Sequence, residues 1–121
     1  MSRRILVVED QEDNRQIIRD MLSASDYELA DAENGVEALA SVAKPKPDLI
    51  LMDIQLPIMD GYEATRRIKA QPAMKDVPII AVTSYALSGD EQKARDAGCD
   101  DFVPKPYSPR QLLAKIRQYL P

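Results

Sequence analysis

Side chains that could bind a metal ion and a phosphoryl group follow several short apolar runs of this 121-residue sequence. Residues 5–8 precede Glu9 and Asp10, and residues 49–52 precede Asp53. Residues 77–82 precede Thr83, and residues 102–103 come shortly before Lys105. Because an unpaired charge is costly to bury, a carboxylate directly after a buried strand indicates an open strand end with compensating partners.

Three of these side chains are carboxylates, and their mutual repulsion decides what they can bind. Two unit charges about 4 Å apart repel by roughly 4 kcal/mol at an effective dielectric constant near 20. Glu9, Asp10 and Asp53 would therefore need more compensation than the ammonium of Lys105. Mg²⁺, which prefers oxygen ligands, would supply it. Asp53 would then be a nucleophile beside the metal, with Lys105 and Thr83 holding phosphoryl oxygens.

Each residue also has an ordinary structural explanation. Glu9 and Asp10 could cap a helix. Asp53 could begin a turn, Thr83 is a common strand residue, and a lone Lys105 would be solvated. Their joint placement at successive strand ends favours the chemical interpretation.

The elements that position these residues follow from apolar patterning. We predict strands at residues 5–8, 27–32, 49–52, 77–82 and 102–103. Helical spacing gives four stripes: Ile17, Ile18, Met21 and Leu22; Val36, Leu39, Ala40 and Ala43; Ala64 and Ile68; Leu112, Leu113, Ile116 and Leu120. A further helical segment, residues 87–97, has a thin apolar face. Strict alternation of strands and helices, with strands that lack in/out periodicity, predicts a doubly wound α/β domain with a parallel sheet.

Capping signals precede each predicted helix. In chain order they are Asp10 with acids in the next turn, Asn34-Gly35, Asp60-Gly61, Ser88-Gly89 and Ser108-Pro109.

Composition excludes several classes of protein. The length fits one domain, residues 1–121, and no apolar run approaches the length of a membrane span. The absence of histidine removes histidine metal sites and histidine-activated nucleophiles. A net charge of −4 argues against a nucleic-acid surface, so Arg66 and Arg67 are interpreted as a solvated helix face. The single cysteine, Cys99, and the lack of a signal peptide predict a cytoplasmic location.

The order of these motifs resembles the receiver domain of two-component response regulators. The resemblance covers essentially the whole chain and is carried by Val8-Glu9-Asp10, residues 51–61 (LMDIQLPIMDG), Ala81-Val82-Thr83 and Lys105-Pro106. Residues 52–57 and 86–90 look most like DivK-type single-domain regulators or the receivers of hybrid kinases. The resemblance implies a flavodoxin/CheY-like fold with five helices and five parallel strands in the order 2-1-3-4-5.

The resemblance also assigns roles to individual residues. It implies that Asp53 is phosphorylated and that Mg²⁺ is held by Glu9, Asp10, Asp53 and the backbone carbonyl of Gln55. Thr83 matches the switch hydroxyl, Lys105 the lysine that contacts the phosphoryl group, and Phe102 the switch aromatic. The Lys105–Pro106 bond would be cis. Because residue 102 is not tyrosine, a hydroxyl contact is absent at the output surface, which leaves open which partners read the switch.

The function implied is that of a phosphoacceptor that catalyses only its own phosphorylation and dephosphorylation. A sensor histidine kinase or a histidine phosphotransfer protein would donate from a phosphohistidine, and a downstream protein target would read the signal. The segment from residue 87 to residue 97 would move with the switch. The chain stops at Pro121, so we expect no output domain, and Tyr119 could support a homodimer.

Two alternatives belong to other classes. An aspartate-nucleophile phosphatase would need an acid two residues beyond Asp53, where the sequence has Gln55. An interaction module that never carries phosphate would not need Asp53, Thr83 and Lys105 together.

Overall fold

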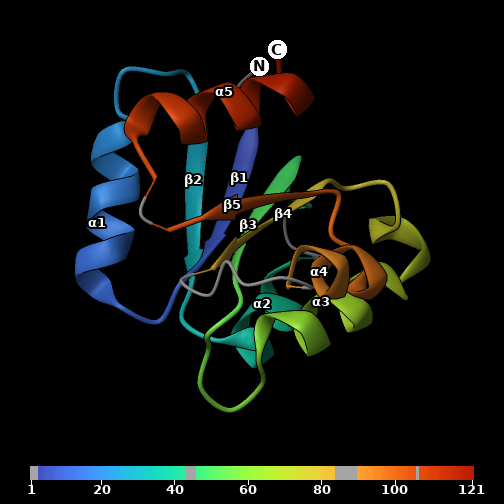
Figure 1. Cartoon of the computed structure of the whole chain (residues 1–121). Coiled ribbons are helices and arrows are strands. Elements are labelled where there is room, and N and C mark those ends of the chain that lie inside the picture. The colour runs from blue at the N-terminus through green and yellow to red at the C-terminus, as the bar shows by residue number, and fades with distance from the viewer. Residues whose placement is uncertain (1–2, 43–45, 84–89, 106) are drawn as a thin grey trace.

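The computed structural model describes residues 3–42, 46–83, 90–105 and 107–121 and shows a parallel sheet between two layers of helices (Figure 1). The strands are β1 (Arg4–Val8), β2 (Glu28–Ala32), β3 (Leu49–Asp53), β4 (Ile79–Thr83) and β5 (Asp101–Pro104). The helices are α1 (Glu12–Met21), α2 (Gly35–Ser41), α3 (Gly61–Lys69), α4 (Asp90–Ala97) and α5 (Pro109–Tyr119), with a 3₁₀ turn at Pro72–Met74. The strand order β2-β1-β3-β4-β5 confirms the predicted doubly wound fold.

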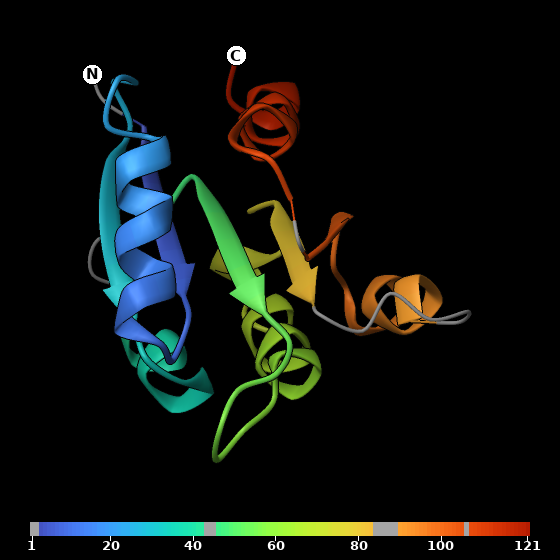
Figure 2. The ribbon, with the colours of Figure 1, turned by 60° about the vertical axis from the view of Figure 1, so that its left-hand side comes forward.

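Each face of the sheet has its own apolar core. Helices α1 and α5 cover one face, and α2, α3 and α4 cover the other (Figure 1 and Figure 2). Along β1, Ile5 and Val7 pack into the first core, whereas Leu6 and Val8 pack into the second. Every residue of β3 and β4 is buried, which explains why these strands have continuous apolar runs.

Most of the predicted helix starts are confirmed. The side chains of Asn34, Asp60 and Ser108 accept backbone N–H groups at the starts of α2, α3 and α5, and Ser108 forms a capping box with Gln111. The prediction for Asp10 is wrong: α1 begins at Glu12, and Gln11 rather than Asp10 occupies the cap position. Asp10 therefore lies in the loop between β1 and α1. Ser88 and Gly89 lie outside the described residues.

Other predictions need correction. The predicted apolar stripes include Ile17 and Val36, which are 49% and 50% exposed, and Ala40, which is exposed as well. Ile17 lies about 100° around α1 from the buried Ile18, on an exposed side of the helix. Tyr119 is half buried, with its ring against the core of α1 and α5, and is not an exposed apolar residue. Within the described part of the chain, no helix has the length and apolar character needed to cross a bilayer.

The sheet register brings the strand ends to one edge. Val8 pairs with Met52, and Asp53 pairs with Val82, so Glu9 leaves β1 at the level of Asp53. Helix α3 starts directly against the end of β3, where Gly61 donates its N–H to the Ile54 carbonyl at 3.0 Å. A Cβ at Gly61 would lie 2.4 Å from the Asp53 carbonyl oxygen, so a residue with a side chain could not take this position without a shift of the backbone.

Candidate functional site

The carboxylates of Glu9, Asp10 and Asp53 meet at the carboxyl edge of the sheet. One oxygen from each lies within 4.8 Å of the others. Glu9 and Asp53 are only 3% and 5% exposed, whereas Asp10 is half buried. The structure thus brings together the three acids that the sequence analysis placed at one edge.

Several hydrogen bonds hold Glu9. Its backbone N–H donates to the Ala32 carbonyl at 3.0 Å, at the end of β2. Its Oε2 accepts the Gln11 backbone N–H at 3.1 Å, and its Oε1 accepts Nζ of Lys105 at 3.2 Å. The Glu9 side chain is therefore held from two segments of the chain, and its backbone is held by the end of β2.

Lys105 lies between the two buried carboxylates. Its Nζ is 3.2 Å from Glu9 Oε1 and 3.6 Å from Asp53 Oδ2. Its backbone N–H donates to the Thr83 carbonyl at 2.7 Å, which ties the end of β5 to the end of β4. A single ammonium is thus shared between two acids.

The electrostatics of the cluster show an excess of negative charge. Burial and the neighbouring Glu9 carboxylate raise the pKa of Asp53 to about 7, although Lys105 and the Gln55 N–H act in the opposite direction. Burial and then Glu9 also raise the pKa of Asp10. Burial would raise the pKa of Glu9, but the Gln11 N–H and Lys105 together lower it. Three hard oxygen donors with too little positive charge fit a divalent cation such as Mg²⁺.

Gln55 connects Asp53 to Thr83. Its backbone N–H donates to Asp53 Oδ1 at 3.0 Å, and its side-chain Nε2 donates to Thr83 Oγ1 at 2.6 Å. Thr83 is completely buried. The sequence predicts a role only for the Gln55 carbonyl. This side-chain link, which joins the nucleophile candidate Asp53 to the switch candidate Thr83, has no signal in the sequence.

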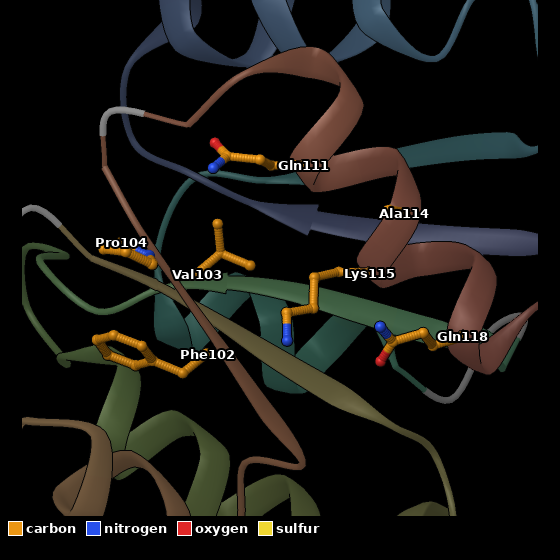
Figure 3. Close-up of a pocket in the computed structure, with 7 residues that line it drawn as sticks. All are labelled: Phe102, Val103, Pro104, Gln111, Ala114, Lys115 and Gln118. Carbon is orange, nitrogen blue, oxygen red and sulfur yellow. The ribbon is translucent and has the colours of Figure 1, made fainter.

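Phe102 lies on β5, away from the acidic cluster. Its half-buried ring packs against the core of α2, α3 and α4, whereas Val103 packs into the core of α1 and α5. A groove of about 310 Å³ between β5 and α5 is lined by Phe102, Val103, Pro104, Gln111, Ala114, Lys115 and Gln118 (Figure 3). Pro106 lies outside the described residues, and with it the predicted cis bond.

Two residues beside the cluster were missed by sequence reasoning. Arg15 donates Nη1 to the Glu9 carbonyl at 2.7 Å. Tyr107 is half buried near the acids, and its pKa is raised first by burial and then by Glu9 and Asp53. The signal for Arg15 is its spacing: it stands three residues before Ile18, on the apolar face of α1, where a charged residue needs a buried partner.

Known proteins share this sequence and this fold. Residues 5–117 match the response regulator receiver domain family. The polar-differentiation response regulator DivK of Brucella anthropi is 42% identical over 120 residues, which cover 99% of this chain and 98% of that protein.

Solved structures of similar sequence share the fold of this chain. The receiver domain of the sensor histidine kinase PA1611 from Pseudomonas aeruginosa PAO1, with a magnesium ion coordinated in its active site cleft, has a TM-score of 0.91 at 38% identity, covering 99% of this chain and 98% of that one. The chemotaxis protein CheY4 of Vibrio cholerae has a TM-score of 0.92 at 28% identity, covering 98% of this chain and 99% of that one. This chain therefore belongs to the response regulator receiver domain family, and it is a DivK-like response regulator homologous to the receivers of two-component systems.

Proposed function

We propose that Asp53 accepts a phosphoryl group from the phosphohistidine of a sensor histidine kinase or a histidine phosphotransfer protein. The observation that carries this proposal is the meeting of three carboxylates with one shared ammonium at the carboxyl edge of the sheet. Asp53 ends a fully buried strand, so its oxygens are held rigidly at the crevice where open α/β sheets bind ligands.

The metal partner of this reaction is Mg²⁺. Glu9, Asp10, Asp53 and the Gln55 carbonyl would hold it. Bound there, Mg²⁺ offsets the charge of the acids and of the phosphoryl oxygens. The magnesium ion in the cleft of the homologous receiver from Pseudomonas aeruginosa supports this assignment.

The residues around Asp53 have distinct roles in the transfer. An Asp53 oxygen forms the new P–O bond as the P–N bond of the donor breaks and the imidazole leaves. Lys105, whose Nζ is 3.6 Å from Asp53 Oδ2, pairs with one phosphoryl oxygen. Thr83, whose Oγ1 accepts from Gln55 Nε2, donates its hydroxyl proton to another phosphoryl oxygen as its side chain moves toward Asp53.

The same movement of Thr83 gives the receiver an output. Movement of Thr83 toward the phosphoryl group leaves space into which Phe102 can turn from its half-exposed position. A downstream protein target reads the altered surface. The thin apolar face of α4 makes this helix the element that such a change can shift.

Catalysis is limited to the receiver's own phosphorylation and dephosphorylation. A phosphatase acting on small phosphoesters would need an acid where Gln55 stands, and a neutral amide cannot protonate a leaving group. We place the chain in the cytoplasm with its kinase. Cys99 is a free thiol, which agrees with this location.

Intact mass spectrometry after incubation with acetyl phosphate tests the proposal. The wild-type protein is expected to gain one phosphoryl group with Mg²⁺ and to lose most of this labelling in chelator. Asp53→Asn is expected to remain unlabelled. Asp101→Asn, which changes another buried carboxylate of the sheet, is the matched control and is expected to label normally. Normal labelling of Asp53→Asn would refute the assignment.

A further inference from the structure

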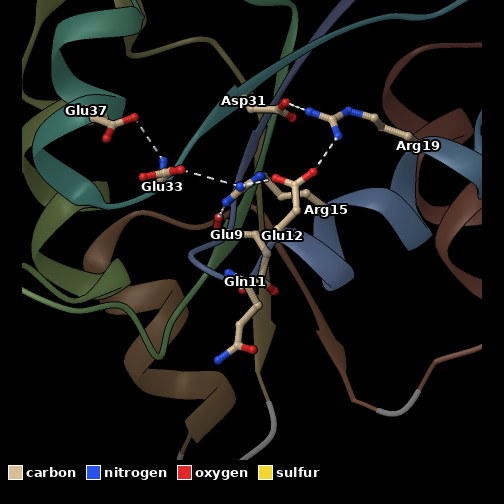
Figure 4. A network of polar contacts seen from close by, with 8 residues as sticks. All are labelled: Glu9, Gln11, Glu12, Arg15, Arg19, Asp31, Glu33 and Glu37. Carbon is tan, nitrogen blue, oxygen red and sulfur yellow. Dashed lines mark hydrogen bonds and ion pairs between the residues drawn. The ribbon is translucent and has the colours of Figure 1, made fainter.

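A buried arginine lies beside the acidic cluster on the side of α1. Arg15 is only 6% exposed, and its Nη1 donates to the Glu9 carbonyl at 2.7 Å. Its Nη2 pairs with Glu12 and lies 3.4 Å from Oε1 of Glu33 (Figure 4). The guanidinium thus ties the first turn of α1 and the start of the β2–α2 loop to the end of β1.

The carbonyl that Arg15 binds belongs to the peptide unit between Glu9 and Asp10. Because a peptide unit is planar, fixing the direction of this C=O also fixes the backbone N–H of Asp10. On its other side, Glu9 is held by its N–H bond to the Ala32 carbonyl. The backbone that carries the two adjacent acids therefore has a set orientation before any metal binds.

We propose that Arg15 is a positioning residue for the Mg²⁺ site, acting through the Glu9 carbonyl to set how Glu9 and Asp10 face each other. This inference rests on the proposed function, which assigns Mg²⁺ to these acids. Mg²⁺ demands near-ideal octahedral geometry, so misdirected ligands lose affinity. Groups that orient metal ligands commonly contribute strongly to metal affinity without touching the ion.

If Arg15 acted only through its charge, its removal would strengthen Mg²⁺ binding, whereas loss of a positioning residue weakens it. A guanidinium beside the site repels a divalent cation, so removing the charge would tighten Mg²⁺ binding if Arg15 acted only through its field. Weaker binding after its removal therefore identifies the positioning role by the sign of the change.

Helix α1 offers a matched control. Arg19 lies one turn further along and pairs with Asp31, and it also reaches Glu12 at 3.4 Å (Figure 4). Arg19→Met removes the same charge from the same helix and leaves the bond from Arg15 to the Glu9 carbonyl in place. Any general effect of charge or helix stability on Mg²⁺ affinity will show in this variant as well.

Isothermal titration calorimetry with MgCl₂ tests the inference, after melting curves in chelator establish that each variant is folded at the titration temperature. Arg15→Met is expected to weaken Mg²⁺ binding about tenfold, and Arg19→Met is expected to change it by less than about twofold. If Arg15→Met does not fold, Arg15→Lys is measured in its place. Lysine keeps the positive charge but lacks the planar guanidinium, so Mg²⁺ binding is expected to weaken about threefold.

Three results would overturn the inference. The first is unchanged or tighter Mg²⁺ binding in the Arg15 variant that folds. The second is an equal loss of Mg²⁺ affinity in Arg19→Met, and the third is no Mg²⁺ binding by the wild-type protein. The last result alone would also overturn the proposed function, so the two failures are distinguishable.

Discussion

Asp53 and Asp101 are both buried carboxylates of the same sheet, yet their surroundings differ in charge balance. Asp53 is the last residue of β3 and shares one ammonium with Glu9 beside a third acid. Asp101, the first residue of β5, is 8% exposed. It accepts from Lys115 Nζ at 2.9 Å, from the Phe102 N–H at 2.9 Å and from the Tyr119 hydroxyl at 3.1 Å.

The pKa values of the two acids shift in opposite directions. Burial and Glu9 raise the pKa of Asp53 to about 7. Burial would also raise the pKa of Asp101, but Lys115, the Phe102 N–H and Tyr119 outweigh it, and the net pKa is lowered. Burial is therefore not what distinguishes the two acids. The distinction lies in whether the fold itself supplies the compensating charge or leaves it to a ligand.

The largest expected contrast is in stability. Asp101→Asn is expected to lose about 2 kcal/mol, because it weakens charge-assisted hydrogen bonds at a buried site. At pH 8 in chelator, where Asp53 is ionised, Asp53→Asn is expected to gain about 1 kcal/mol, because it removes repulsion from Glu9. Urea unfolding measures both changes. Equal losses in the two variants would break the comparison.

The pH dependence of stability provides a second contrast. Folded Asp53 keeps its proton up to about pH 7, whereas the unfolded chain releases it near 3.8. Between these values the folded state binds more protons, so in chelator the free energy of unfolding should fall as pH rises from 4 to 7.

Asp101 should change the free energy of unfolding with pH in the opposite direction. Its stabilising contribution is present above pH 3.8 and should be lost as pH falls further, through its lowered folded-state pKa. Unfolding measured from pH 3 to pH 8 with the two Asn variants separates the two acids. If Asp53→Asn leaves the slope between pH 4 and pH 7 unchanged, the raised pKa of Asp53 is not its source.

The smallest expected effect concerns Tyr119. Tyr119→Phe removes the hydroxyl that donates to Asp101 and keeps the ring in the core, so it should cost about 0.5–1 kcal/mol. The melting temperature measures this loss. Tyr107→Phe, beside the acidic cluster, is the matched control. An equal loss in that variant would show that the bond from Tyr119 to Asp101 is not the source of the effect.

The sequence predicts much of the fold because buried parallel strands must be continuously apolar. The runs ending at Asp53 and Thr83 show this directly, and all five strands are present with boundaries shifted by one or two residues. Helix starts depend on local chemistry, so Asn34, Asp60 and Ser108 are predicted correctly. Asp10 is not, because the same carboxylate suits both a helix cap and a cluster of acids, and local sequence cannot separate the two.

The remaining features depend on contacts between distant segments. The bond from Gln55 to Thr83 spans 28 residues, and that from Lys105 to Glu9 spans 96. The acids could be placed at one edge because parallel strands end together, whereas the link from Gln55 to Thr83 requires the packing itself. For Arg15 the spacing indicates a buried partner, but only the packing shows that this partner is the Glu9 carbonyl. The partners of Asp101 in α5 were missed for the same reason.

Urea unfolding of wild-type protein and Asp10→Asn, in chelator and in excess Mg²⁺, shows whether three acids share one edge with too little positive charge until a divalent cation binds. We predict that Asp10→Asn is about 1 kcal/mol more stable than wild type in chelator. We also predict that Mg²⁺ stabilises the wild type by about 2.7 kcal/mol at 100 times its dissociation constant, and the variant much less. An Asp10→Asn variant that is less stable in chelator and gains as much from Mg²⁺ would contradict the account.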